Sequence, residues 1–229
     1  MTRFNIGPGH RPGGGATGGG YILLCLTIAA LLWPGPARGG SFSLRGISFS
    51  DELGGFVLER VSGRGTILDP FVVVERLTNP DGATLVFRAS AAVGNGIGSP
   101  DRIGFALVKV IKNATGHDWS SLEIELQSRF GIPSDHNDEL SFGQGSTAGR
   151  PFTASDFARV TLIDEPFDRI EYDAGNVPAG GQVTLRFVVS QPASLHEAFI
   201  AQRPGRPVAM QPIGPIDRLI ALGHAGAAP

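Results

Sequence analysis

Cysteine is almost absent from this chain. Cys25 is the only cysteine among 229 residues, so the chain can form no internal disulfide and no cysteine-based zinc site. Cys25 also lies within the N-terminal region, which we expect to be removed on export. We therefore expect the remaining domain to be stabilised by packing alone.

An excess of charge of one sign is also missing. Lysine and arginine total 19, aspartate and glutamate total 21, and the formal net charge is −2. This balance argues against nucleic acid as the main partner, because binding to phosphates needs a basic patch. No basic amphipathic helix is present that would favour adsorption to a lipid surface.

Long hydrophobic runs are missing too, with one short exception near the start. The apolar segment 21–32 would reach about 18 Å as a helix, against roughly 30 Å for the hydrocarbon core of a bilayer. Pro34 and the small-residue pattern Gly35-Pro36-Ala37 follow. This arrangement predicts a signal peptide over residues 1–37. The alternative is an uncleaved N-terminal membrane anchor. With cleavage we expect no membrane span and a secreted, periplasmic or cell-surface protein.

Amphipathic helical periodicity is lacking beyond residue 40, where short alternating segments and turn signals predominate. This pattern predicts an all-β fold, a single antiparallel β-sandwich of roughly nine strands. We expect the sandwich over residues 41–202 and a mobile tail rich in Pro, Gly and Ala over residues 203–229. The expected strands are 41–49, 55–61, 66–76 interrupted at Pro70, 83–88, 102–111, 121–127, 157–163, 167–172 and 181–189, with 194–200 either a last edge strand or a helical turn.

The segment 121–127 shows the alternation most clearly. Its odd positions are Ser, Glu, Glu and Gln, and its even positions are Leu122, Ile124 and Leu126. One face should therefore be packed and the other wet, as in an antiparallel sheet with one solvated side.

The densest polar cluster lies in the long loop 131–150. Asp135, Asn137, Asp138 and Glu139 offer oxygen atoms of the kind that Ca²⁺ prefers. Counted from Asp135, however, the sixth and twelfth positions are Leu140 and Ser146, where an EF-hand has Gly and Glu. The two interpretations are a weak Ca²⁺ site and a solvated acidic loop, and otherwise no cofactor is expected.

No set of catalytic residues is apparent. The chain has no Gly-x-Ser-x-Gly motif, and His117, His136 and His196 are not spaced as paired metal ligands. Two carboxylates from separate segments, such as the acidic stretch 164–173, could meet as an acid–base pair, but spacing does not show this. We therefore predict that the protein is not an enzyme.

Two segments resemble a known group of proteins. Asn113-Ala-Thr-Gly-His-Asp-Trp119 with the strand that follows, and Asp168-Arg-Ile-Glu-Tyr-Asp-Ala-Gly-Asn-Val-Pro-Ala-Gly-Gly-Gln-Val-Thr-Leu-Arg-Phe187, are similar to segments of exported bacterial β-sandwich proteins of the PEP-CTERM or choice-of-anchor type. The resemblance spans about residues 102–191 and implies export and fold more than activity. This chain lacks the C-terminal sorting tag of that group, since it ends Gly-His-Ala-Gly-Ala-Ala-Pro.

The same segments have a simple physical interpretation. Asn113 and Gly116 suit a tight turn between paired strands, and Trp119 just beyond it would cap the open end of the core. The alternative is that the Trp119 ring is exposed and stacks on a sugar.

These observations predict an exported, non-enzymatic β-sandwich protein of the bacterial envelope or extracellular matrix, with a structural or interaction role. Its partners would be envelope or matrix components, including glycans. The alternative is a soluble secreted module that binds Ca²⁺ or carbohydrate through the loop 131–150. The sequence leaves the oligomeric state open.

Overall fold

The computed structural model describes residues 39–143, 152–164 and 166–206. The chain divides into two units, Met1–Ala37 and Arg38–Pro229, and every described residue belongs to the second. The predicted signal peptide, residues 144–150 of the loop 131–150 and residues 207–229 of the predicted tail therefore lie outside the described residues. Within them, no helix is both long and apolar enough to cross a membrane.

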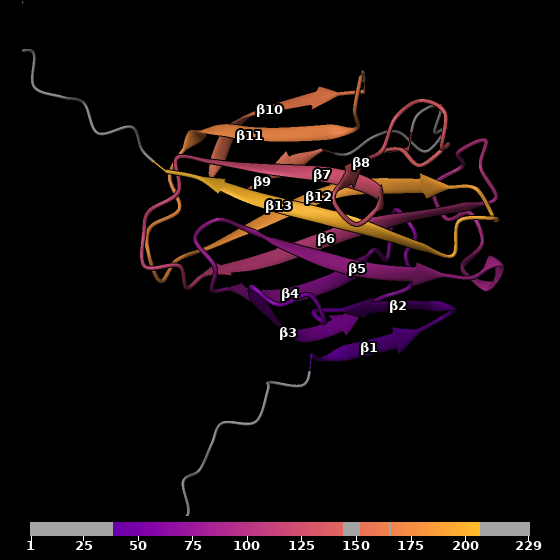
Figure 1. Cartoon of the computed structure of the whole chain (residues 1–229), viewed down its shortest axis with the longest axis horizontal. Coiled ribbons are helices and arrows are strands. Elements are labelled where there is room, and N and C mark those ends of the chain that lie inside the picture. The colour runs from indigo at the N-terminus through magenta and orange to yellow at the C-terminus, as the bar shows by residue number, and fades with distance from the viewer. Residues whose placement is uncertain (1–38, 144–151, 165, 207–229) are drawn as a thin grey trace, which may run out of the picture. The chain divides into compact units, whose positions relative to one another are not determined.

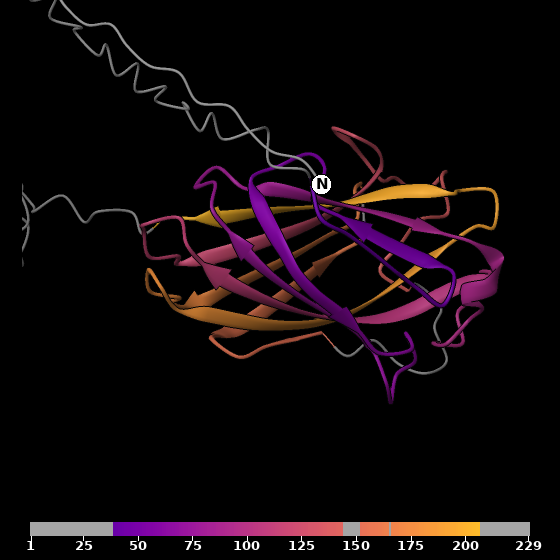
Figure 2. The same cartoon turned by 90° about the horizontal axis from the view of Figure 1, so that it is seen from below.

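The described chain forms two β-sheets that pack face to face (Figures 1 and 2). One has eight strands in the order β1-β2-β5-β13-β7-β11-β10, with β8 also paired to β7, and the other has the order β3-β4-β6-β12-β9. The strands are β1 (Ser41–Leu44), β2 (Ile47–Ser50), β3 (Phe56–Ser62), β4 (Phe71–Leu77), β5 (Ala83–Ala89), β6 (Ile103–Asn113), β7 (Ser121–Arg129), β8 (Ile132–Pro133), β9 (Thr153–Ala154), β10 (Phe157–Ile163), β11 (Arg169–Gly175), β12 (Gln182–Gln191) and β13 (Glu197–Gly205). A short 3₁₀ helix, η1 (Ala91–Val93), precedes β6.

The predicted all-β sandwich is confirmed, with two differences in pairing. Strands β4 and β6 run parallel, with Val73 opposite Lys109, whereas the sequence predicted a purely antiparallel sandwich. The ambiguous segment 194–200 contributes to β13, which pairs with both β5 and β7. It is therefore a central strand, and it continues to Gly205, beyond the predicted end of the domain at residue 202.

The described chain has more strands than the expected nine, because a turn divides the expected strand 41–49 and the two-residue strands β8 and β9 lie outside the expected strands. Arg45 and Gly46 both have positive φ, +49° and +82°, and they form a two-residue hairpin turn between β1 and β2. Such a turn needs left-handed backbone at both positions, which suits glycine and is costly for arginine. The sequence offered no strong turn signal at this point.

The core lies between the two sheets and contains a row of phenylalanine rings. Phe49 contacts Phe71, Phe71 contacts Phe105, and Phe105 contacts Phe87, all edge to face at 5.6–5.8 Å between ring centroids. Phe49 and Phe87 belong to one sheet, and the other two rings belong to the other. The row therefore joins the sheets, in a geometry favoured by the aromatic quadrupole.

The outer face of β7 is less wet than its alternation predicts. Leu122, Ile124 and Leu126 point into the core as expected, but Glu125 and Gln127 on the outer face are also buried. The Gln127 amide donates to Glu125 at 2.7 Å, and Arg203 of β13 donates to Glu125 at 2.9 Å. Neighbouring side chains thus satisfy these polar groups in place of water.

Candidate functional site: an acidic pocket

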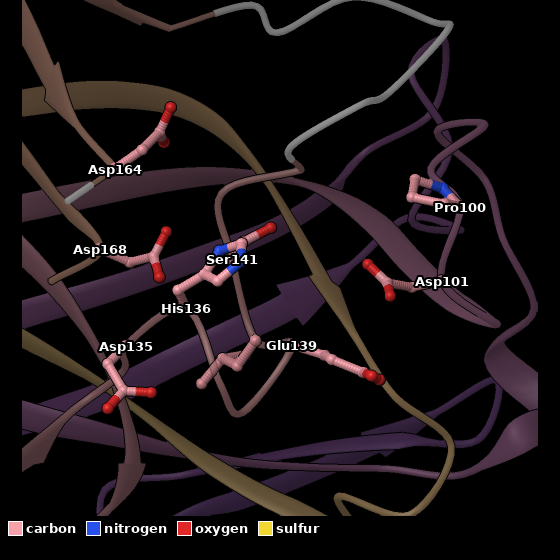
Figure 3. Close-up of a pocket in the computed structure, with 9 residues that line it drawn as sticks. Pro100, Asp101, Asp135, His136, Glu139, Ser141, Asp164 and Asp168 are labelled. Atoms are coloured by element: carbon pink, nitrogen blue, oxygen red, sulfur yellow. The ribbon is translucent and has the colours of Figure 1, made fainter. Parts of the chain in front are cut away.

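Three segments that are distant in sequence form an acidic pocket at one end of the sandwich. Its volume is about 250 Å³. The segments are the approach to β6, the loop 134–142 after β8, and the turn between β10 and β11. The lining comprises Pro100, Asp101, Asp135, His136, Glu139, Leu140, Ser141, Asp164 and Asp168. In the view of Figure 3, Asp164 and Asp168 lie on one side and Asp101 on the opposite side.

Hydrophobic anchors hold the loop 134–142 in place. Leu140 and Phe142 are buried in the main core, and Phe142 contacts Phe187 of β12 edge to face at 5.7 Å. Full burial of two such side chains stabilises the loop by several kcal/mol relative to leaving them exposed, about 1.5–3 kcal/mol each. The polar residues between these anchors and β8 are therefore carried on a fixed support.

The Ser134 hydroxyl is buried next to two lining residues of the pocket, Leu140 and Asp168, and its three hydrogen-bond contacts within the described residues are all to acceptor oxygens. The Leu140 carbonyl oxygen is 2.6 Å from Ser134 Oγ, Asp138 Oδ1 is 2.9 Å away and Asp168 Oδ2 is 3.2 Å away. A hydroxyl has one proton to donate. The shortest of the three contacts assigns that proton to the Leu140 carbonyl.

Asp168 is 3% exposed. Burial raises the pKa of its carboxyl from 3.8 to about 7, and the nearby Asp164 and Asp138 add to the rise, while the contact with Ser134 and a hydrogen bond from the Phe142 N–H oppose it. Asp168 also joins strands through its backbone. Its N–H donates to the Ser134 carbonyl at 3.2 Å, and its carbonyl accepts from the Leu126 N–H at 3.1 Å.

The four residues predicted as Ca²⁺ ligands do not converge on one point. Asp135 and Glu139 line the acidic pocket, whereas Asn137 and Asp138 line a different hollow, which Asp135 and Arg129 also border. The Asp138 carboxylate also accepts hydrogen bonds from Ser134 and from the Leu140 N–H at 3.0 Å. Among the residues that the structure describes, no group of three or more His, Asp or Glu side chains is arranged to hold a metal ion.

Glu139 has an unusual backbone conformation, with φ at +59°. Left-handed backbone costs a residue with a Cβ roughly 1–2 kcal/mol. Such strain persists only where the surroundings fix it, and it is concentrated at functional sites. The conformation places the Glu139 side chain on the pocket wall.

Trp119 does not present its ring to solvent. It is 1% exposed, belongs to the core and donates from Nε1 to Thr115 Oγ1 at 3.0 Å. This buried position agrees with the predicted role of Trp119 as a cap on the core. The alternative of sugar stacking on Trp119 is wrong for this conformation, because stacking needs an exposed ring face.

The two segments singled out by resemblance meet in space as a clasp, which we define as residues 113–119 and 177–181. Asn113 Nδ2 donates to the carbonyls of His117, Val177 and Pro178 at 2.7–3.1 Å. Trp119 and Val177 exchange both backbone hydrogen bonds at 2.9 Å. This contact is structural, and it buries the Asn113 side chain.

Sequence reasoning missed the residues that complete the pocket. Asp101 had no distinguishing signal, and Ser134 was one hydroxyl in a polar loop. Asp164 and Asp168 were noticed as part of an acidic stretch and interpreted as wet faces. The available signal was the presence of two acidic segments, 135–139 and 164–173, but their convergence depends on the pairing of β7 with both β8 and β11.

Comparison with known proteins gives no relative from which a function could be transferred. No protein-family model, no curated protein and no solved structure matches this chain at a significant level.

Proposed function

We propose that this protein is an exported, non-enzymatic interaction protein of the bacterial envelope or extracellular matrix, and that its acidic pocket binds a cationic group carried by that material. The observation that carries the binding role is the gathering of five carboxylates with one histidine around a single pocket. A lining of this composition attracts a cation, and the low-dielectric wall strengthens that attraction.

The size of the pocket favours an organic cation over a bare metal ion. Ca²⁺ needs six to eight oxygen ligands at 2.3–2.6 Å, and the described carboxylates form no such group. An alkylammonium or guanidinium group is larger and binds through several hydrogen bonds to carboxylates at longer range. A pocket of about 250 Å³ has room for such a group. Ca²⁺ binding remains the second candidate, supported by Asp135 and Glu139 on the same wall.

The hydrogen bonds of Ser134 and Asp168 support a binding role over a catalytic one. The Ser134 hydroxyl is buried and donates to a backbone carbonyl, so it is not presented as a nucleophile beside a base. Asp168 is held inward against the same hydroxyl. Export itself is supported by the apolar segment 21–32 and the small-residue pattern that follows it.

Isothermal titration of the domain with spermidine tests the binding role, with CaCl₂ titrated in parallel and NaCl matched for ionic strength. The double variant Asp135→Asn/Glu139→Gln should weaken spermidine binding at least about tenfold, since two charges near the ligand are lost. Asp81→Asn is the matched control, because Asp81 lies in the turn between β4 and β5, away from the pocket, and its side chain is 85% exposed. Equal binding by all three proteins would contradict the proposal.

Intact mass and fractionation of the chain expressed from its own start test the exported state. A species beginning at Arg38 in association with envelope or matrix material is the expected result. A mass that retains residues 21–32 in the membrane fraction would support the anchored alternative instead.

A further inference from the structure

We propose that a proton held between Asp168 and Ser134 acts as a pH-operated latch that fastens the loop 134–142 to the start of β11. The contacts at Ser134 carry this inference. Its single hydroxyl proton serves the Leu140 carbonyl at 2.6 Å, so its lone pairs face Asp138 Oδ1 and Asp168 Oδ2. Two lone pairs facing two ionised carboxylates would repel, unless one carboxyl carries a proton and donates it.

Asp168 is the carboxyl that holds this proton. It is the more buried of the two, and burial disfavours the charged form of a carboxyl. Asp138 Oδ1 accepts a hydrogen bond from the Leu140 N–H at 3.0 Å. Two consecutive hydrogen bonds result: Asp168 Oδ2–H donates to Ser134 Oγ, and Ser134 Oγ–H donates to the Leu140 carbonyl. Each of these donors has an acceptor.

The Asp168–Ser134 contact lies where β7 stops pairing with β11 and begins to pair with β8. The Leu126 carbonyl accepts from the Ser134 N–H at 2.8 Å, the Asp168 carbonyl accepts from the Leu126 N–H, and the Ser134 carbonyl accepts from the Asp168 N–H. The pairing of β7 thus passes from β11 to β8 at this point. Release of the proton removes the hydrogen bond from Asp168 to Ser134, while the hydrogen bond from the Phe142 N–H to the Asp168 carboxylate remains.

Carboxylates from two other segments favour the protonated form of Asp168. Asp138 from the loop and Asp164 from the turn between β10 and β11 raise its pKa, and Asp101, Asp135, His136 and Glu139 share the pocket. Among the described lining residues none is lysine or arginine. Loss of the proton adds a further negative charge to the pocket and loosens the loop that forms its wall.

The consequence for binding, which rests on the proposed function, is that cation affinity rises with pH. A bound cation stabilises ionised Asp168. If it lowers the pKa of Asp168 by one unit, the dissociation constant of spermidine falls about tenfold between pH 5.5 and pH 8.5.

The latch is tested without any ligand, on the chain expressed without its predicted signal peptide, as residues 38–229. Carboxyl ¹³C NMR should show Asp168 titrating with a midpoint near 7, and Asp164→Asn should move that midpoint towards acid. Asp168→Asn keeps a donor to Ser134 at every pH. Its melting temperature minus that of the wild type should therefore increase by roughly 5 °C or more from pH 5 to pH 8.

A midpoint near 3.8, or parallel pH profiles for wild type and Asp168→Asn, would overturn the latch. The Asp164→Asn titration keeps the test decisive if Asp168→Asn fails to fold. Failure of spermidine to bind at any pH, with a normal Asp168 titration, would instead contradict the proposed function and leave the latch standing.

Discussion

Lys109 Nζ lies 3.1 Å from Glu75 Oε2, and both side chains are completely buried in the sandwich. Glu75 is on β4 and Lys109 on β6, the two strands that pair in parallel. Each lies on the same strand face as core residues, since Glu75 is two positions after Val73 and Lys109 two positions after Leu107. Burial lowers the pKa of Lys109, and the negative charge of Glu75 opposes that shift.

Removal of either partner of this pair should be strongly destabilising. Lys109→Met or Glu75→Gln alone leaves a buried charge without its counterion, at a cost of about 3–5 kcal/mol. The double variant Glu75→Leu/Lys109→Met should fall within about 2 kcal/mol of the wild type, because the desolvation penalty disappears with the charges. Urea unfolding measures all three. Additive losses would show that the two side chains do not act as a pair.

Asn113 should contribute substantially to stability through its side-chain hydrogen bonds within the clasp. Asn113→Ala leaves the carbonyls of Val177 and Pro178 without this donor, at a cost of about 2–3 kcal/mol. Asn113→Asp should cost at least as much at neutral pH, because a carboxylate would face three carbonyls. Chemical denaturation measures the free energy of unfolding of both variants. An unchanged denaturation midpoint for Asn113→Asp would show that the side chain does not donate to these carbonyls.

Trp119→Phe should destabilise the domain by about 1–3 kcal/mol, since the variant loses volume in the core and the hydrogen bond to Thr115. Trp33 and Trp119 are the two tryptophans of the chain, so a domain that begins at residue 38 carries Trp119 alone. Its fluorescence should be blue-shifted in the folded state and move to the red on unfolding. A red-shifted emission in the folded protein would mean that the ring is exposed.

Glu139 should show opposite effects on stability and binding. Glu139→Gly relieves the positive φ and should leave stability unchanged or raise it by up to about 1 kcal/mol. Glu139→Gln keeps the backbone strain and loses the charge. Both variants should weaken spermidine binding to a similar extent. Thermal unfolding should distinguish them, because only Glu139→Gly is relieved of the backbone strain. Retained affinity in both would remove Glu139 from the binding site.

The pH dependence of stability follows from Asp168. Its folded pKa of about 7 lies above the ordinary value of 3.8, so between these two pH values the folded state holds a proton that the unfolded state has released. Stability from this group is therefore fully present below about pH 4 and is lost as pH rises towards 7. The melting temperature of the wild type should therefore contain a contribution that falls as pH rises from 4 to 7, and Asp168→Asn should lack this contribution.

The sequence by itself determined the fold class and much of the core. Alternation with period two identified Leu122, Ile124 and Leu126 as core residues, and turn residues placed Asn113 at the start of a turn. These are local properties, because each side chain's direction in a strand follows from its position along the chain. The same reasoning recognised 135–139 and 164–173 as the acidic segments.

Only the tertiary structure decided which of these groups meet. The parallel pairing of β4 with β6 brings Glu75 to Lys109, and the change of partner along β7 brings Asp168 to Ser134. Strand order depends on the packing of whole sheets, and no local periodicity encodes it. The pKa of Asp168 depends in turn on burial and on carboxylates from other segments. The chemistry of the pocket is for that reason a property of the assembled fold.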